Sequence, residues 1–327
     1  MLEKSLTLAC IRFASATNGC MTFLAIEIGG TKLQIYAGSG SGEIFERHRF
    51  SVVPAAGGEG IRAQILEVLP TLFEKWKPAA IGVGYGGPVD WKTGRVQCSH
   101  HIAGWDDFPL ADWLHEHSRV PVFVENDANA AALAEALHGA GRGYSTVFYV
   151  QIGTGVGGGL VVDGRLYHSA APGEMEIGHV RLDRESTTVE DMCSGRMIDR
   201  HIREMVDYHP ETVLARLARE TADGGDARLL VPALAEGCWL AEEMLTTTME
   251  YLAFALGHVV QLLHPEIIVF GGGLALIGEP LRERLARALP QWVMTAFQPG
   301  PRVALSELKE DAVPVGALAL AHTRMSH

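Results

Sequence analysis

The chain has 327 residues, more than a single hydrophobic core usually serves, which predicts two domains with a cleft between them. Hydrophobic residues make up 47% and charged residues 20%, a composition that argues against a disordered or fibrous protein. A formal charge of −12 without a basic run argues against nucleic acid and anionic membranes as partners. The five cysteines are scattered without C-x-x-C spacing, which suits a reducing compartment, and we expect a cytoplasmic protein.

Residues 1–22 form a weakly patterned N-terminal segment. An early Lys4 and a short apolar run broken by Arg12 give a poor imitation of a signal peptide, without a small-residue cleavage site. We expect residues 1–22 to be a loosely ordered extension, and Met21 remains an alternative start of translation.

The first half of the chain alternates strand and helix patterns. Apolar runs of strand length flank a glycine-rich turn, and apolar residues at helical spacing follow. The predicted elements are strands at 23–28, 33–37 and 44–50, a helix at 61–76 that Pro70 could kink, and a strand at 80–83 leading into G-Y-G-G-P-V-D. This half therefore reads as an α/β unit.

The second half repeats the outline. A strand at 122–124 leads into E-N-D-A-N-A-A-A, whose alanines predict a helix at 128–138. Beyond it we expect a strand at 146–152, the glycine turn Gly153–Gly159, a returning strand at 160–164, a long helix over 244–263 and a strand at 266–270. One strand–glycine turn–strand unit in each half predicts two similar domains facing each other.

Three glycine-rich turns follow apolar strands, at Gly29–Lys32, Gly153–Gly159 and Gly271–Gly273. Glycine lets backbone N–H groups approach an anion closely, so phosphate oxygens are natural occupants. A single such turn is more often just a hairpin, but three are harder to dismiss. None fits the Walker pattern G-x-x-x-x-G-K-[ST], and we expect none to open a helix as a dinucleotide fingerprint would.

Asp127 stands between a buried strand and a helix, where α/β folds carry catalytic groups. The alternative is that Asp127 only caps the helix, and this segment alone favours that alternative. The second polar cluster, G-E-M-E-I-G-H, offers Glu174, Glu176 and His179, which could hold sugar hydroxyls. A solvated loop is the other interpretation, which we prefer for Glu174.

Taken together, these motifs resemble the ROK family (repressors, open reading frames and kinases) from about Phe23 to the C-terminus. The matches are E-I-G-G-T-K, E-N-D-A-N-A-A-A, G-T-G-V-G-G-G, E-I-G-H and I-V-F-G-G-G, in the family's order and spacing. The resemblance implies an α/β protein of two actin-like (ribonuclease H-like) domains with a ligand cleft between them. It also implies ATP, Mg²⁺ and transfer of the γ-phosphoryl group to a hexose hydroxyl.

The resemblance also implies roles for individual residues. Asp127 would be the general base, and the sugar ligands would be Gly87, Asn126, Asp127, Glu176, His179 and Glu190. The nucleotide would contact Gly29, Gly30, Thr31, Lys32, Gly153, Thr154, Gly155, Gly271, Gly272 and Gly273. Glu27, where the family has Asp, would act on Mg²⁺ through bound water.

The chain departs from the family pattern at four places. Between His179 and Glu190 the family usually carries a cysteine-rich zinc loop, and here the stretch V-R-L-D-R-E-S-T-T-V lacks cysteine, so we expect no structural zinc. Besides Glu27, Gly86 stands where proline is common, and Met175 replaces the glycine before Glu176. We expect these changes to tune the sugar pocket.

The domain boundaries follow from the motifs. Residues 23–124 would form a smaller α/β domain, completed by a C-terminal helix at 312–327, and residues 125–311 a larger one carrying the sugar and nucleotide motifs. The predicted function is that of a glucokinase-like hexose kinase whose partners are a sugar and ATP. A homodimer is possible, since dimers are common in the family.

Two other functions stay open. A sugar-responsive transcription regulator would need a DNA-reading module of about three helices of about 11 residues each. We expect residues 1–22 to be too few for such a module. A sugar-binding protein with weakened catalysis is suggested by Glu27 alone. Among sugars, the resemblance puts glucose first, followed by N-acetylglucosamine, N-acetylmannosamine, mannose, fructose and allose.

Overall fold

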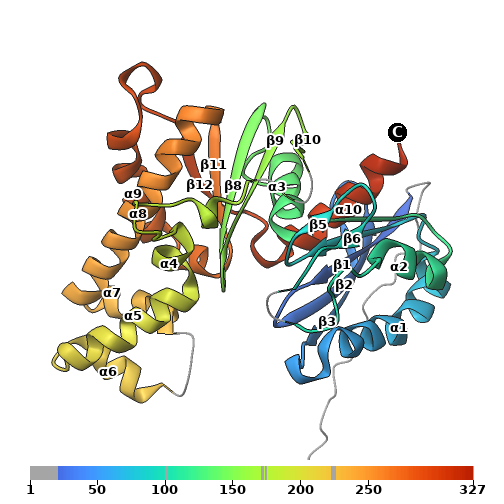
Figure 1. The fold of residues 1–327 in the computed structure, drawn as a ribbon, viewed down its shortest axis with the longest axis horizontal. Coiled ribbons are helices and arrows are strands. Elements are labelled where there is room, and N and C mark those ends of the chain that lie inside the picture. Colours follow the sequence, from blue (N-terminus) through green and yellow to red (C-terminus); the bar gives the residue numbers. More distant parts are fainter. Residues whose placement is uncertain (1–20, 100–101, 171–172, 174, 222–225, 327) are drawn as a thin grey trace, which may run out of the picture.

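The computed structural model describes residues 21–99, 102–170, 173, 175–221 and 226–326. Two lobes stand side by side, each built on a five-stranded sheet (Figure 1). The expected extension over residues 1–22 lies outside the described residues except for Met21 and Thr22, and Thr22 already opens the first strand. Within the described part of the chain, no helix is long and apolar enough to cross a membrane.

The first sheet has the strand order β3-β2-β1-β4-β7. Its strands are β1 (Thr22–Ile28), β2 (Lys32–Ser39), β3 (Ile44–Ser51), β4 (Ile81–Tyr85) and β7 (Val122–Asn126). β1, β2 and β3 pair antiparallel, whereas β4 pairs parallel with both β1 and β7. The predicted hairpin around Gly29–Lys32 is confirmed. Since β1, β4 and β7 run parallel, their carboxyl ends meet at one edge of the sheet.

Residues of β1 alternate between two cores, as the period of a strand requires. Leu24 and Ile26 pack in a cluster with α1 (Gly57–Trp76) and α2 (Leu110–Ser118), whereas Phe23 and Ala25 pack in a cluster with α10 (Ala312–Met325). The sheet is therefore covered on both faces, which explains why β1 reads as a continuous apolar run. The predicted kink at Pro70 does not end α1, which runs through that residue.

The second sheet repeats the topology of the first, with the order β10-β9-β8-β11-β12. Its strands are β8 (Thr146–Ile152), β9 (Val156–Val162), β10 (Arg165–Leu166), β11 (Ile267–Gly271) and β12 (Arg302–Leu305). β8, β9 and β10 pair antiparallel, and β11 pairs parallel with β8 and β12. The prediction of two similar units, each with a glycine turn between paired strands, is confirmed.

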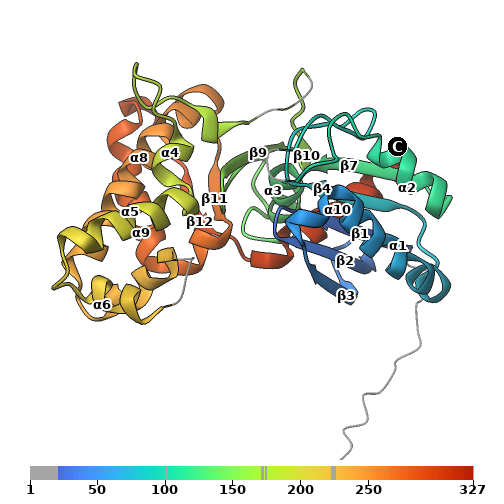
Figure 2. The same ribbon diagram turned by 60° about the horizontal axis from the view of Figure 1, so that its bottom comes forward.

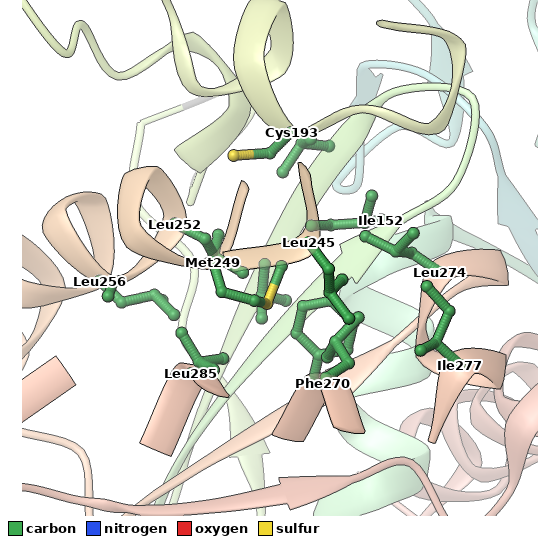
Figure 3. Close-up of a cluster of buried hydrophobic side chains, with 14 of the residues drawn as sticks. Ile152, Cys193, Leu245, Met249, Leu252, Leu256, Phe270, Leu274, Ile277 and Leu285 are labelled. Atoms are coloured by element: carbon green, nitrogen blue, oxygen red, sulfur yellow. The ribbon is translucent and has the colours of Figure 1, made fainter. Parts of the chain in front are cut away.

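Helices form the outer layer of the second lobe around a large apolar cluster. Leu245, Met249, Leu252 and Leu256 of the longest helix, α8, lie in this cluster together with Phe270 of β11 (Figure 3). The outer helices of this lobe are α4 (Val189–Cys193), α5 (Gly195–Tyr208), α6 (Val213–Glu220), α7 (Leu230–Ala235), α8 (Trp239–Leu263) and α9 (Glu279–Ala288), whereas α3 (Asp127–His138) faces the first lobe. The helix predicted over 244–263 thus begins at Trp239.

Short elements complete the described structure. A two-stranded ribbon joins β5 (Val89–Asp90) to β6 (Arg95–Val96). The 3-10 helices are η1 (Pro54–Ala56), η2 (Ile177–His179), η3 (Asp226–Leu229), η4 (Gly273–Ile277), η5 (Leu289–Trp292), η6 (Thr295–Phe297) and η7 (Lys309–Asp311).

Helices α3 and α10 lie between the two sheets and join the lobes (Figure 2). Their contact is close because the facing residues are small: a Cβ atom at Gly316 would lie 1.7 Å from the carbonyl oxygen of Ala130. The alanines that predict the α3 helix therefore also let α10 approach it. This packing brings the C-terminal helix against the first sheet, in keeping with its predicted place in the smaller domain. The exact residues at which the two domains meet stay a prediction.

We expect Gly316→Ala to destabilise the protein, because a Cβ atom only 1.7 Å from the Ala130 carbonyl oxygen would force the two helix backbones apart. Overpacking typically costs about 1–3 kcal/mol, and a backbone clash belongs at the upper end of that range. Thermal unfolding should show a melting temperature several degrees lower. Gly273→Ala is the matched control, since no atom lies within 4 Å of a Cβ atom built there. Equal melting temperatures for the two variants would contradict this packing.

Candidate active site

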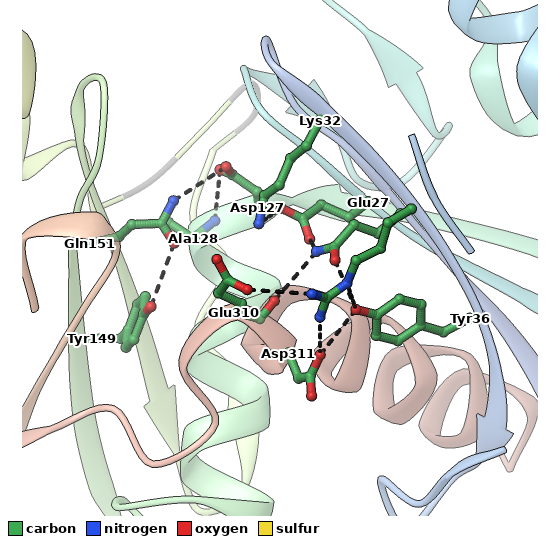
Figure 4. Close-up of polar contacts among 11 residues, drawn as sticks. Glu27, Lys32, Tyr36, Asp127, Ala128, Tyr149, Gln151, Glu310 and Asp311 are labelled. Atoms are coloured by element: carbon green, nitrogen blue, oxygen red, sulfur yellow. Dashed lines mark hydrogen bonds and ion pairs between the residues drawn. The ribbon is translucent and has the colours of Figure 1, made fainter. Parts of the chain in front are cut away.

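Glu27 lies at the carboxyl end of β1 and is 4% exposed. Its Oε1 is 2.9 Å from Lys32 Nζ, and its Oε2 accepts a hydrogen bond from the side-chain amide of Gln34. Gln34 in turn accepts a 2.7 Å hydrogen bond from Tyr36 Oη (Figure 4). Burial raises the pKa of Glu27, although Lys32 and Gln34 act in the opposite direction. Both carboxylate oxygens are therefore engaged within the first lobe.

Asp127 is the first residue of α3 and is part-buried near Glu27 (Figure 4). Its Oδ1 accepts a 2.8 Å hydrogen bond from the backbone of Ala128, and its Oδ2 lies 3.4 Å from Gln151 Nε2. Burial, followed by the charge of Glu27, raises the pKa of Asp127 to about 6. Such a carboxylate is ionised at neutral pH yet takes up a proton readily, as a general base must.

The N-cap of α3 is Asn126 and not Asp127. Asn126 Oδ1 accepts hydrogen bonds from the backbone N–H groups of Ala128 and Asn129, at 2.9 and 3.2 Å. The alternative interpretation of Asp127 as the helix cap is therefore wrong. Asn126 Nδ2 donates to the carbonyl of Gly87 at 3.1 Å, which ties the start of α3 to the G-G-P-V-D turn.

Gly86 leaves room between Asp127 and the first glycine turn. A Cβ atom there would lie 3.6 Å from Asp127 Oδ2 and 3.6 Å from Gly29 Cα. The departure from the family's proline thus occurs at a position in contact with both the carboxylate and the turn. A group held by Gly29–Lys32 would lie beside the Asp127 carboxylate.

The second and third glycine turns also lie close together. Gly272 has φ +83°, and a Cβ atom there would lie 2.3 Å from the carbonyl of Ile152, next to Gly153. Only glycine fits this position without strain. The third turn leads directly into η4, so the expectation that no glycine turn opens a helix is wrong for Gly271–Gly273.

Glu190 lies against the second glycine turn. Its Oε2 accepts a 3.0 Å hydrogen bond from the backbone of Val156, and a Cβ atom at Gly155 would lie 2.6 Å from the same oxygen. Its other oxygen is 3.7 Å from Arg196. The structure thus brings this predicted sugar ligand to the turn predicted to hold phosphates.

A cleft of about 1070 Å³ opens beside these turns, lined by Gly153, Thr154 and Gly273. Apolar side chains of η4, including Leu274 and Ile277, form one wall. Residues of α5 and η3 that sequence reasoning missed line the cleft with both signs of charge: Arg196, Arg200, Arg203 and Arg228, together with Asp199 and Glu204. The i, i+4, i+7 spacing of the first three was the available signal. An apolar wall beside glycine turns and arginines suits a base linked to phosphates.

A much smaller pocket of about 10 Å³ adjoins Asn126 and contains Glu176. Its other walls are Pro88, Val89, Trp91, Glu125, Asn129 and Gly173. Asn126, Gly87 and Glu176 are thus brought near one another, as predicted for sugar ligands. His179 is exposed on η2 and does not line this pocket. Glu174 lies outside the described residues.

Gln151 and Glu125 are two further polar residues at the site that sequence reasoning missed. Gln151 interrupts the apolar strand β8 one residue before its end, and a polar side chain in a buried strand was the signal. Glu125, two residues before Asp127, is 1% exposed and belongs to a hydrogen-bonded pair with His168.

Met175 shows what the replacement of glycine does to the backbone. It has φ +59°, a conformation that favours glycine and strains other residues by about 1–2 kcal/mol. The strain lies one residue before Glu176, the predicted sugar ligand.

The segment between His179 and Glu190 closes on itself. Arg181 and Thr188 form a β-bridge, and Asp183 Oδ1 accepts hydrogen bonds from the backbone of Glu185 and Thr187 at 2.7 and 3.1 Å. These local contacts provide a way to order the loop without a metal. Among the residues that the structure describes, no group of three or more His, Cys, Asp or Glu side chains could hold a metal ion.

We expect the purified protein to contain no structural zinc. Cys193, the cysteine nearest in sequence to His179, is buried. Burial raises the pKa of its thiol to about 12, which disfavours the thiolate that zinc needs. Elemental analysis after dialysis should find zinc far below one ion per chain. One tightly held zinc per chain would overturn this expectation.

The carboxylates of this site fit Mg²⁺ through water bound to the ion, and not by direct coordination. Both oxygens of Glu27 are engaged by Lys32 and Gln34, so direct coordination would break these contacts. A hydrated ion bound mainly by phosphates, as is usual for Mg²⁺, could still use Glu27 and Asp127 as acceptors for its water.

Similarity to a solved structure defines the fold of this chain, and a match to a family model defines its family. A ROK family glucokinase from Streptomyces griseus, solved with glucose and AMPPNP, superposes with a TM-score of 0.82 at 28% identity over 92% of this chain and 99% of that one. The protein thus has the two-domain actin-like ATPase fold. The ROK family model matches residues 23–324, and the chain belongs to the ROK family.

Curated relatives include both enzymes and regulators. A glucokinase from Halalkalibacterium halodurans is 30% identical over 90% of this chain and 93% of its own length. A xylose repressor from Caldicellulosiruptor bescii is 24% identical over 91% of this chain and 77% of its own length.

Proposed function

We propose that the protein is an ATP-dependent hexose kinase with Asp127 as its general base. The observation that carries the proposal is the position of Asp127, beside the Gly29 turn and next to Asn126 of the small polar pocket, with its pKa raised to about 6. Glucokinase relatives, and the complex of one ROK glucokinase with glucose and AMPPNP, support the same function.

In the proposed reaction, a hexose hydroxyl attacks the γ-phosphorus, the bond to the ADP oxygen breaks, and the hydroxyl proton passes to Asp127 Oδ2. Phosphoryl transfer depends mainly on positioning and charge stabilisation. The N–H groups of the three glycine turns would bind phosphate oxygens, and Gln151 would keep the Asp127 carboxylate in place. Bound Mg²⁺ would neutralise charge on the phosphate oxygens.

The sugar would enter beside Gly87, Asn126 and Glu176, with the nucleotide in the cleft lined by Gly153 and Gly273. His179 and Glu190 remain proposed sugar ligands, but each would have to turn or move to reach the small pocket. Closure of the lobes would exclude water, which competes as acceptor of the phosphoryl group.

An ADP-release assay over a panel of hexoses tests this function. With ATP and magnesium, ADP should form at a rate that depends on the sugar, with glucose, N-acetylglucosamine, N-acetylmannosamine, mannose, fructose and allose compared at equal concentration. ADP release no faster with any sugar than without sugar would contradict the proposal.

The engagement of Glu27 favours one alternative, a sugar-binding protein with weak catalysis. If Lys32 and Gln34 hold the carboxylate away from the metal's water shell, kcat would be low while sugar affinity stayed high. Calorimetric binding of the best sugar, measured beside its turnover, separates the two functions.

The pKa of Asp127 predicts the acid limb of the pH profile. We expect kcat/KM to be nearly constant above about pH 7, to reach half of that plateau near pH 6 and to fall further below it, because only the ionised carboxylate accepts the proton. The apparent value belongs to Asp127 and Glu27 together, since the two carboxylates repel each other. Initial rates between about pH 5 and 9 check this, and a rate unchanged down to pH 5 would contradict it.

A further inference from the structure

Trp91 connects the two lobes beside the small pocket. It directly follows β5, in the segment that begins with Gly87, and its indole stacks on the ring of His168, with centroids 4.1 Å apart and planes at 20°. His168 belongs to the other lobe, two residues after β10. The guanidinium of Arg324 lies 4.8 Å from the centroid of the Trp91 ring.

The His168 ring is itself anchored. Its Nε2 lies 2.7 Å from Oε2 of the buried Glu125, whose other oxygen accepts a 2.9 Å hydrogen bond from the backbone of Asn126. Asn126 is the N-cap of α3 and precedes Asp127. A continuous set of contacts therefore runs from the indole ring to the start of the helix that carries the proposed base.

Trp91 and Glu125 both line the pocket that contains Asn126 and Glu176. The indole Nε1 is buried and has no hydrogen-bond partner among the described residues. Leaving such a donor unpaired is unfavourable, so a ligand that accepts from it gains affinity. A hexose offers hydroxyl oxygens that can accept a hydrogen bond from this N–H group.

We propose that Trp91 is a hexose-contacting residue that determines sugar specificity, and that His168 is the positioning residue that holds it. The inference rests on the proposed function. The pocket has room for about one water molecule, so a hexose can enter only if Trp91 or its neighbours move. Hexose binding therefore changes the surroundings of the indole.

Two measurements test the proposal. Adding glucose without nucleotide should change the tryptophan emission of the wild-type protein and of Trp113→Phe, but not that of Trp91→Phe. Trp113, on α2 among other aromatic rings, is the matched control. In steady-state kinetics, Trp91→Ala should raise the KM for the hexose about tenfold and change the ranking of the sugars, while the KM for ATP stays the same.

His168→Gln keeps a donor for Glu125 but removes the ring. It should raise the KM for the hexose several-fold, less than Trp91→Ala does, with kcat unchanged. A Trp91→Ala protein with a KM for the hexose within twofold of wild type and the same sugar ranking would overturn the proposal while leaving the kinase function intact. If the wild-type protein phosphorylates no hexose, the proposed function itself fails, and the emission change alone then decides whether Trp91 contacts sugar.

Discussion

Asp127→Asn is expected to lower kcat by about 10²–10⁴-fold while hexose affinity stays close to wild type. The amide oxygen can still accept the hydrogen bond of the Ala128 backbone, and the amide nitrogen replaces Oδ2, where it can donate to the sugar hydroxyl once the Gln151 amide turns its oxygen toward it. It cannot accept the proton, so only the chemical step suffers. Single-turnover rates and calorimetric binding of the best sugar separate the two quantities.

The same substitution should not destabilise the fold, which provides the control. The pKa of Asp127 is raised from 3.8 to about 6, so the folded wild-type protein binds this proton more tightly than the unfolded chain does. Wild-type stability from this group is therefore present below pH 3.8 and lost as the pH rises through about 6. Asp127→Asn should melt higher than wild type above pH 6, and the difference should vanish near pH 3.8. Near wild-type kcat in this variant would remove Asp127 from catalysis.

Glu27→Ala is expected to lower kcat by about 10²-fold and to raise the magnesium concentration needed for half-maximal rate. Glu27 is longer than the family's Asp by one methylene, about 1.5 Å, and Mg²⁺ tolerates little departure from octahedral geometry. Misplacement of a catalytic group by about 1 Å can lower the reaction rate on the order of 10²-fold. The KM for the hexose should not change, because Glu27 contacts Lys32 and Gln34 and does not line the small pocket.

Magnesium titrations of wild type, Glu27→Ala and Glu27→Asp measure this effect. Glu27→Asp restores the family's residue and retains the charge, so it should keep more activity than the alanine variant. Mn²⁺ binding in the presence of a non-hydrolysable ATP analogue, followed by electron paramagnetic resonance, gives a readout independent of turnover. Identical metal dependence and identical kcat in all three proteins would place Glu27 outside the active site.

Local patterns predicted the fold well because the central strands of both sheets are buried on two faces, and β1 and β8 each end at a glycine turn. Phe23–Ile28 is apolar except for Glu27, and Thr146–Ile152 is apolar except for Thr146 and Gln151. Each run ends at a glycine turn that leads into the strand paired with it. The motif order then indicated the family. The boundary at 124/125 stays a prediction, since α3 and α10 pack between the lobes and belong to both.

The site was harder to predict, because it depends on contacts between distant segments. In E-N-D, both Asn126 and Asp127 can cap a helix, and only the extended backbone of Asn126, with φ −62° and ψ 147°, selects the cap. Glu190 reaches Val156 across 34 positions, and nothing in the local sequence of either residue indicates that contact. The pairing of Trp91 with His168 likewise joins two loops whose own patterns are featureless.

Phosphorus NMR of a reaction with ATP, magnesium and glucose shows whether the protein is a hexose kinase built around Asp127. The γ-phosphate signal of ATP should decline as a sugar phosphate monoester appears, with one ADP formed per ester, and Asp127→Asn should show neither change on the same timescale. A spectrum in which ATP persists with every hexose of the panel, or yields only inorganic phosphate, would contradict a hexose kinase built around Asp127.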